Sequence, residues 1–239
     1  MNHLNKRLTY KQPAKDWNEA LPIGNGTLGG MVFGHVHKER VQLNEDSVWY
    51  GGPRDRHNPD ALQSLPKIRE LLAAGRLKEA EELAALTMTG TPETQRHYEP
   101  LGDLFIHFDH ADTGVSHYKR ELDLETAVTS VEYTSSNVTY KRELFTSYPD
   151  QVMVMRITSS EKNAISFKAK LDRGNGRNFD ELEAVAEDTL VIRGETGGSN
   201  GIVFRSAVKA IAENGSVQTL GNHLIVENAD AVTLLLTAA

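Results

Sequence analysis

Ile165-Ser-Phe-Lys-Ala-Lys-Leu171 is the stretch that best indicates the fold of this chain. Apolar and polar residues alternate strictly along it, which is the period of a β-strand with one buried face and one solvent face. Similar β-prone runs recur at short spacing on both sides, and turn signals such as Ser135-Ser-Asn137 and Glu213-Asn-Gly215 separate several of them. Ten or more antiparallel strands are typical of a mainly β protein, and we expect a large antiparallel β-sandwich rather than a barrel. The other expected strands are 30–36, 40–44, 104–108, 127–133, 138–145, 152–158, 189–193, 202–210, 216–220, 224–227 and 231–239.

A short helical insert interrupts this pattern near residues 61–87. Leucine, isoleucine and alanine recur there at the spacing of a helix face, and Gly75 divides the segment into two parts. Lys78 and Glu82 stand four residues apart, as in a surface ion pair. The segment predicts two helices or one broken helix.

Composition limits the classes of partner. The chain has 239 residues, with 26 Lys and Arg against 33 Asp and Glu, and a formal net charge of −7. This mild acidity argues against nucleic acid or an anionic membrane as the main partner. Cysteine is absent, which excludes disulfides and thiolate metal sites.

The two ends of the sequence suggest a compartment and a truncation. Met1-Asn-His-Leu-Asn-Lys-Arg-Leu8 lacks the apolar core of a signal peptide, and no run is long enough for a membrane helix. We therefore expect a cytoplasmic protein with no membrane partner. Ala231-Val-Thr-Leu-Leu-Leu-Thr-Ala-Ala239 stops in β-prone sequence, which suggests the first part of a longer protein.

The block from Trp17 to Asp60 carries most of the functional signal. It combines glycines, which allow close approach of the backbone to a partner, with amides, acids and tryptophan. Those groups suit a polar, ring-shaped ligand such as a sugar. Gly24-Asn-Gly-Thr-Leu-Gly29 fits the dinucleotide fingerprint in letters only, because β-like sequence follows it instead of a helix.

Two clusters within this block have competing interpretations. His35 and His37 could share one side of a strand, but no third metal ligand is evident, so we expect surface positions near a turn and no metal site. Glu45 and Asp46 precede Trp49, and an acid beside an indole could bind sugar hydroxyls while the ring stacks on a pyranose. The alternative is a capped turn with Trp49 in the core.

Several long motifs resemble one family. They are Trp17-Asn-Glu-Ala-Leu-Pro-Ile-Gly-Asn-Gly-Thr-Leu-Gly-Gly30, Leu43-Asn-Glu-Asp-Ser-Val-Trp-Tyr-Gly-Gly-Pro53, Tyr98-Glu-Pro-Leu-Gly-Asp-Leu104 and Tyr140-Lys-Arg-Glu-Leu-Phe-Thr-Ser-Tyr-Pro-Asp150. In this order they resemble the N-terminal domain of glycoside hydrolase family 95, the α-L-fucosidase family. The resemblance implies a β-sandwich over residues 1–239, related to that of family 65 phosphorylases. It also implies a downstream (α/α)6 barrel, absent from this chain, that hydrolyses α-L-fucosides with inversion.

The resemblance places the catalytic acid and base in that barrel, so no catalytic residue and no cofactor is assigned here. We expect the chain to pack on the barrel and to line the rim of a pocket for fucosylated oligosaccharides. Two alternatives remain, a stand-alone carbohydrate-binding β-sandwich module and a purely structural interaction domain. The candidate rim residues, chosen from chemistry and clustering, are Glu19, Asn25, Asn44, Glu45, Trp49 and His97.

Overall fold

The computed structural model describes residues 6–110, 114–173 and 181–239. The chain divides into two compact units, which are treated separately below. The β unit comprises Met1–Val48, Glu99–Thr196 and Ile202–Ala239, and the helical unit comprises Trp49–Tyr98 and Gly197–Gly201.

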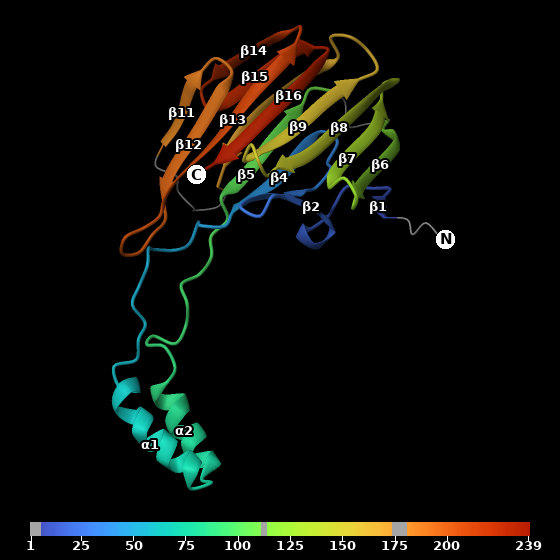
Figure 1. The fold of residues 1–239 in the computed structure, drawn as a ribbon. Helices are drawn as coiled ribbons and strands as arrows, with labels where there is room; N and C mark the ends of the chain where they lie inside the picture. The colour runs from blue at the N-terminus through green and yellow to red at the C-terminus, as the bar shows by residue number, and fades with distance from the viewer. Residues whose placement is uncertain (1–5, 111–113, 174–180) are drawn as a thin grey trace. The chain divides into compact units, whose positions relative to one another are not determined.

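The β unit is a sandwich of two antiparallel sheets (Figure 1). Within the described residues, one sheet has nine strands in the order β1-β6-β7-β8-β9-β16-β13-β12-β11. The other has seven strands in the order β14-β15-β10-β5-β4-β3-β2. The predicted antiparallel β-sandwich is therefore confirmed.

The elements have the following bounds. In the nine-stranded sheet they are β1 Arg7–Tyr10, β6 Ser116–Asp123, β7 Val128–Ser135, β8 Val138–Ser147, β9 Val152–Ser159, β11 Glu181–Ala186, β12 Thr189–Glu195, β13 Val203–Glu213 and β16 Ala231–Ala238. In the seven-stranded sheet they are β2 Leu21–Gly24, β3 Leu28–Val32, β4 Lys38–Glu45, β5 Gly102–Phe108, β10 Ile165–Asp172, β14 Ser216–Leu220 and β15 His223–Ala229. The helices are the 3₁₀ turn η1 Trp17–Glu19, α1 Ala61–Ala73 and α2 Leu77–Thr87.

One face of each strand builds the core between the sheets. On β10, Ile165, Phe167, Ala169 and Leu171 are buried while the residues between them are at least partly exposed. This is the alternation that the sequence shows, and burying such side chains is the main stabilising contribution to a sandwich.

Charged residues also enter the core of the β unit. Arg120 on β6, Arg142 on β8 and Glu39 on β4 are all 1% exposed or less. Arg142 Nη1 lies 2.8 Å from Glu39 Oε2, and its guanidinium stands 5.0 Å from the centre of the Phe108 ring. Buried charges persist where a partner of opposite sign and hydrogen bonds replace water.

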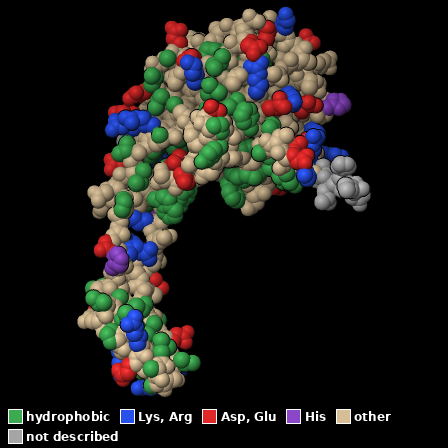
Figure 2. Space-filling view, viewed as in Figure 1, with side chains coloured by type: hydrophobic (Ala, Val, Ile, Leu, Met, Phe, Trp, Pro, Cys, Tyr) green, Lys and Arg blue, Asp and Glu red, His purple; other side chains and the backbone are tan. Residues whose placement is uncertain are grey.

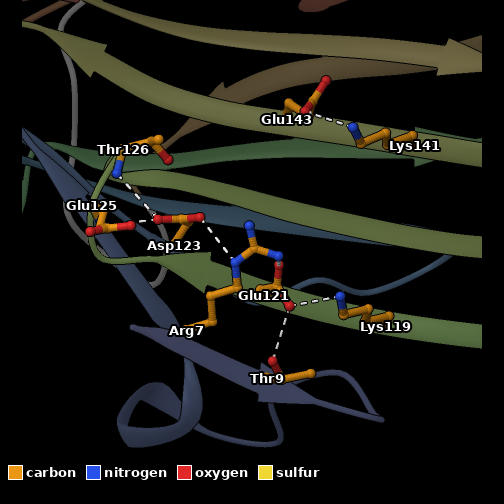
Figure 3. Close-up of polar contacts among 9 residues, drawn as sticks. All are labelled: Arg7, Thr9, Lys119, Glu121, Asp123, Glu125, Thr126, Lys141 and Glu143. Carbon is orange, nitrogen blue, oxygen red and sulfur yellow. Dashed lines mark hydrogen bonds and ion pairs between the residues drawn. The ribbon is translucent and has the colours of Figure 1, made fainter. Parts of the chain in front are cut away.

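Strand β1 closes one edge of the nine-stranded sheet through polar contacts. Arg7 Nε donates to Asp123 Oδ2 at 3.1 Å, and Thr9 Oγ1 donates to Glu121 Oε2 at 3.0 Å (Figure 3). Lys119 Nζ lies 2.7 Å from Glu121 Oε2 on the same surface. These side chains bind an exposed edge strand that has little apolar surface to bury.

The helical unit contains the predicted pair of helices, and the break at Gly75 is confirmed because α1 ends at Ala73 and α2 begins at Leu77. Gly75 has φ +74°, the left-handed conformation that ends many helices. The predicted ion pair is present at its outer limit, with Lys78 Nζ 4.0 Å from Glu82 Oε1. Among the described residues no helix has the length and apolar character to cross a bilayer.

Candidate functional site

The six predicted rim residues fall in both units. Glu19, Asn25, Asn44 and Glu45 belong to the β unit, whereas Trp49 and His97 belong to the helical unit. Within the β unit, the structure brings Asn25, Asn44 and Glu45 to one end of strands β2, β3 and β4. Glu19 precedes the opposite end of β2.

Asn25 forms the turn between β2 and β3. Its Oδ1 accepts hydrogen bonds from the backbone N–H of Thr27 at 3.1 Å and of Leu28 at 2.9 Å, and its Nδ2 donates to the carbonyl of Ser147 at 2.9 Å. Gly26 follows with φ +102°, which a residue with a side chain rarely adopts. The fingerprint Gly24–Gly29 is therefore a hairpin turn between β2 and β3, and the amide of Asn25 is occupied in holding it.

Asn44 and Glu45 end β4 beside this turn. Asn44 is paired with Gly29 and Glu45 with Leu28 in the register of β3 and β4. The carboxylate of Glu45 accepts from Ser47 N at 3.0 Å and from Ser47 Oγ at 2.6 Å. Glu45 thus caps the turn that leaves the strand, while the side chain of Asn44 is exposed.

Glu19 has a local role in the loop before β2. Its carboxylate accepts from the backbone N–H of Lys15 at 2.8 Å, and its carbonyl accepts from Arg120 Nη1 at 2.7 Å. These bonds hold the short 3₁₀ turn against the sandwich.

Trp49 and His97 come from two segments that pair in the helical unit. Trp49 forms an antiparallel bridge with Tyr98, and the N–H of Tyr50 donates to the carbonyl of His97 at 3.0 Å. The rings of Tyr50 and His97 are stacked, with centroids 4.5 Å apart. Trp49 is 38% exposed, so the alternative that placed it in a core is wrong.

Three arginines outside the helices hold together the two segments that lead to and from the helix pair. Arg54 Nη2 donates to the carbonyl of Thr94 at 3.1 Å, and Arg96 Nη1 donates to the carbonyl of Gly52 at 2.7 Å. Arg56 donates to the carbonyls of Pro92 and Glu93. These side chains tie residues 52–56 to residues 92–96.

Most of the acids with a shifted pKa have a lowered pKa. A general acid needs a raised one. Backbone N–H groups of Glu125 and Thr126 hold the pKa of Asp123 below its usual range, and a hydrogen bond from Lys119 does the same for Glu121. Burial raises the pKa of Asp103, and the Arg40 guanidinium 2.6 Å away opposes that shift. A carboxyl that donates a proton near neutral pH needs a raised pKa and access to substrate, and the side chain of Asp103 is only 9% exposed.

Charges of both signs are interspersed over the visible face (Figure 2). His35 lies beside Phe33, with ring centroids 6.1 Å apart, and His37 Nδ1 is 3.3 Å from the carbonyl oxygen of His110. Within the described ranges, no group of three His, Asp or Glu side chains is arranged to hold a metal ion.

Comparison with known proteins identifies the family. The sequence matches the family described as Glycosyl hydrolase family 65, N-terminal domain, over residues 8–239. The chain belongs to this family.

Relatives of this family 65 N-terminal domain include fucosidases. This chain is 34% identical over 256 aligned residues to Alpha-L-fucosidase 2 of Arabidopsis thaliana. The alignment covers 98% of this chain and 30% of that protein. It is 35% identical over 148 residues to Probable alpha-fucosidase A of Aspergillus niger, covering 59% of this chain and 18% of that protein. The predicted resemblance to the N-terminal domain of a fucosidase-like glycosidase is confirmed, and the chain spans less than a third of these relatives.

Two features of the domain are not predicted by its sequence. Gly197 and Gly198 pack on the ring of Tyr50, about 150 residues away along the chain, and no local signal connects them. Glu39 lies outside the expected strands 30–36 and 40–44, but it belongs to β4 and its side chain is fully buried with Arg142. The break in alternation at Arg142 was the visible signal, because strict alternation would have put an apolar residue there.

Proposed function

We propose that this chain is the non-catalytic N-terminal domain of an α-L-fucosidase-like glycoside hydrolase. In the whole enzyme it packs on a downstream (α/α)6 barrel that hydrolyses α-L-fucosides with inversion. The observation that carries the proposal is the unequal coverage, since 98% of this chain aligns with the Arabidopsis fucosidase but only 30% of that enzyme is covered.

The chemistry of the chain supports a non-catalytic role. An inverting glycosidase needs one protonated carboxyl group to give a proton to the leaving oxygen and a second carboxylate to activate water. The candidates Glu19 and Glu45 accept hydrogen bonds from neighbouring backbone N–H groups, so their carboxylates are engaged in holding local turns. The catalytic pair is therefore assigned to the part of the enzyme outside this chain.

A rim role fits some of the six candidates better than others. Asn25 and Glu45 use their polar atoms to hold turns, which leaves them to shape the loop rather than to bind sugar. Asn44, Trp49 and His97 have exposed side chains. We assign any direct contact with a fucosylated oligosaccharide to these three.

The test is an activity comparison. The 239-residue chain and a longer polypeptide, extended to the length of the Arabidopsis relative, would be assayed on 4-nitrophenyl α-L-fucoside and on 2′-fucosyllactose. We expect turnover by the longer polypeptide only. Turnover by this chain alone would overturn the non-catalytic assignment, and an inactive longer polypeptide would overturn the fucosidase assignment.

A stand-alone carbohydrate-binding module is the second candidate, favoured by the exposed aromatic side chains of the helical unit. Calorimetric titration separates the two proposals. A module would bind 2′-fucosyllactose as tightly as the longer polypeptide does, whereas a rim would bind it much more weakly on its own.

A further inference from the structure

A hollow of about 430 Å³ lies in the β unit beside the loop between β3 and β4. The described residues that line it are Pro13, His35, Val36, His37 and Lys38. This volume is that of a site for a small molecule. Two imidazoles and one ammonium group belong to this lining, and none of its five residues is acidic, so the hollow suits a ligand that carries negative charge.

The two histidines of the lining offer hydrogen-bond donors. His37 Nδ1 lies 3.3 Å from the carbonyl oxygen of His110. A carbonyl only accepts, so Nδ1 carries the hydrogen, and in the imidazolium form the opposite nitrogen Nε2 donates as well. The ring of His35 stacks on Phe33, and among the described residues no hydrogen bond engages its nitrogens.

Lys38 also begins a row of cationic side chains across the seven-stranded sheet. In the register of this sheet, His107 on β5 lies between Lys38 on β4 and Lys168 on β10. Residues directly opposite one another share a face of the sheet. These three side chains are exposed while the adjacent Glu39 and Ile106 are buried, so the row lies on the outer face.

The cations of the next row on this face are paired with acids. Arg40 Nε lies 2.6 Å from Asp103 Oδ1, and Lys170 Nζ lies 2.8 Å from Asp172 Oδ2. By contrast, within the part of the chain that the structure describes, neither lysine of the first row has an acid at ion-pair distance. The first row therefore carries uncompensated positive charge.

This excess of positive charge acts on His107. Partial burial of the imidazole is the first cause that lowers its pKa, and Lys38, His37, Lys170 and His223 lower it further. Like charges that face one another across a sheet destabilise it. A bound anion would relieve this repulsion, which favours its binding.

A metal ion and a nucleic acid are the competing ligands for such a cluster. Within the described ranges, no group of three His, Asp or Glu side chains is arranged to hold a metal, and Lys38 would repel a cation. A nucleic acid rewards a broadly basic domain, whereas this chain has a formal net charge of −7. A small anion fits a local positive site on an acidic protein.

We infer that the hollow beside Lys38 binds the oxyanion of a small molecule, either a phosphate or a carboxylate group. Lys38 and the imidazolium form of His37 donate to this group, and Lys168 adds attraction from the same face of the sheet. The inference is independent of the proposed function, because it rests on charge, register and the hollow alone.

Three sugars with similar rings separate the oxyanion from the ring that carries it. D-glucose 6-phosphate supplies a phosphate, D-glucuronate supplies a carboxylate, and D-glucose supplies neither. We expect calorimetric titration of the 239-residue chain, at fixed ionic strength, to show saturable binding of at least one anionic sugar and none of glucose. The tighter of the two anionic sugars identifies the group that the site prefers.

The imidazole signals of a ¹H–¹³C spectrum locate the bound sugar. The variants His37→Gln and His57→Gln assign the two signals that matter. His57 belongs to the helical unit, where its ring contacts Asp55, and serves as the internal control. We expect the anionic sugar to move the His37 signal saturably while the His57 signal stays.

Variants of Lys38 complete the test. Lys38→Ala should weaken binding about tenfold, whereas Lys38→Arg keeps the charge and should retain most of the affinity. Lys141→Ala removes the same charge from an exposed pair with Glu143 on the other sheet and should leave binding unchanged. The backbone spectrum of each variant verifies that it folds.

Four results would overturn the oxyanion site: no binding of either anionic sugar, equal binding of glucose, equal movement of the His37 and His57 signals, or equal losses in Lys38→Ala and Lys141→Ala. None of them bears on the activity comparison, so the oxyanion site can fail while the fucosidase assignment stands. An inactive longer polypeptide would likewise leave the oxyanion site in place.

Discussion

Arg142 Nη1 lies 2.8 Å from Glu39 Oε2 in the sandwich core, and neither side chain has exposed surface. The two residues come from different sheets, since Glu39 is on β4 and Arg142 on β8. Glu39 Oε1 also accepts from the backbone N–H of Gly34 at 2.8 Å, and Arg142 Nη2 donates to the carbonyl of His35 at 2.8 Å. The pair therefore joins the sheets and holds the loop between β3 and β4.

Removing one charge of this pair should destabilise the domain strongly. Glu39→Gln leaves the Arg142 guanidinium buried without its counter-charge, and we expect the free energy of unfolding to fall by about 3–5 kcal/mol. Glu143→Gln is the matched control, because it breaks an exposed pair with Lys141 on the same strand and should cost less than about 1 kcal/mol. Urea denaturation measures both, and equal effects would contradict the role of the buried pair.

Adding a methyl group at Gly197 should loosen the packing of segment 197–201 on the ring of Tyr50. The new Cβ would lie 2.6 Å from the Tyr50 ring, so either the ring or the segment 197–201 must move, at a typical overpacking cost of about 1–3 kcal/mol. We expect faster amide hydrogen exchange at Gly52, whose N–H donates to Ser199. Gly24→Ala, where the nearest atom would be 3.6 Å away, should leave that exchange rate unchanged.

Asn25→Ala should affect stability and leave sugar binding intact. The substitution leaves the N–H groups of Thr27 and Leu28 and the carbonyl of Ser147 without the partner that Asn25 provides, and we expect a loss of about 1–3 kcal/mol of stability. Thermal unfolding measures the loss, and calorimetric titration with 2′-fucosyllactose measures binding. Weakened saccharide binding in a variant of unchanged stability would return Asn25 to the list of direct sugar contacts.

Asp123 should make stability depend on pH in the acid range. Its pKa in the folded chain is held below the ordinary value of about 4, first by the backbone N–H groups of Glu125 and Thr126 and then by Arg7. The stabilising contribution is therefore complete above about pH 4 and is lost as the pH falls through the lower folded-state pKa.

The substitution Asp123→Asn removes this titration, so the variant should lose less stability than wild type between about pH 6 and pH 3. Arg7→Ala should retain most of the wild-type pH dependence, because the backbone donors make the larger contribution. Urea denaturation across this range compares the three proteins. Identical pH profiles of wild type and Asp123→Asn would contradict the assignment.

Local sequence is sufficient to predict most of the strands, but it does not predict the strands that lack regular apolar alternation. The expected strands 165–171 and 138–145 correspond to β10 and β8, and the segment 61–87 contains the two expected helices. Strands β1, β2, β6 and β11 were not predicted. All four residues of β1 are exposed, and β6 places Arg120 in the core, so neither shows apolar alternation.

The candidate site was predictable in its residue types more than in its arrangement. Trp49 and His97 were selected for their chemistry, and the structure brings their segments together in one bridge. Asn25 and Glu45 were selected for the same reason, but their polar atoms hold turns. A sequence does not reveal which hydrogen bonds a side chain has already made.

The order of neighbouring residues is enough to predict the sandwich class, the helical pair and the family, because period-two alternation, helical spacing and long motifs are all local properties. The tertiary fold brings Glu39 to Arg142 inside the core and Gly197 against the ring of Tyr50. Both contacts join residues about 100 or more positions apart, and such pairs are fixed by strand order and chain return rather than by local preference.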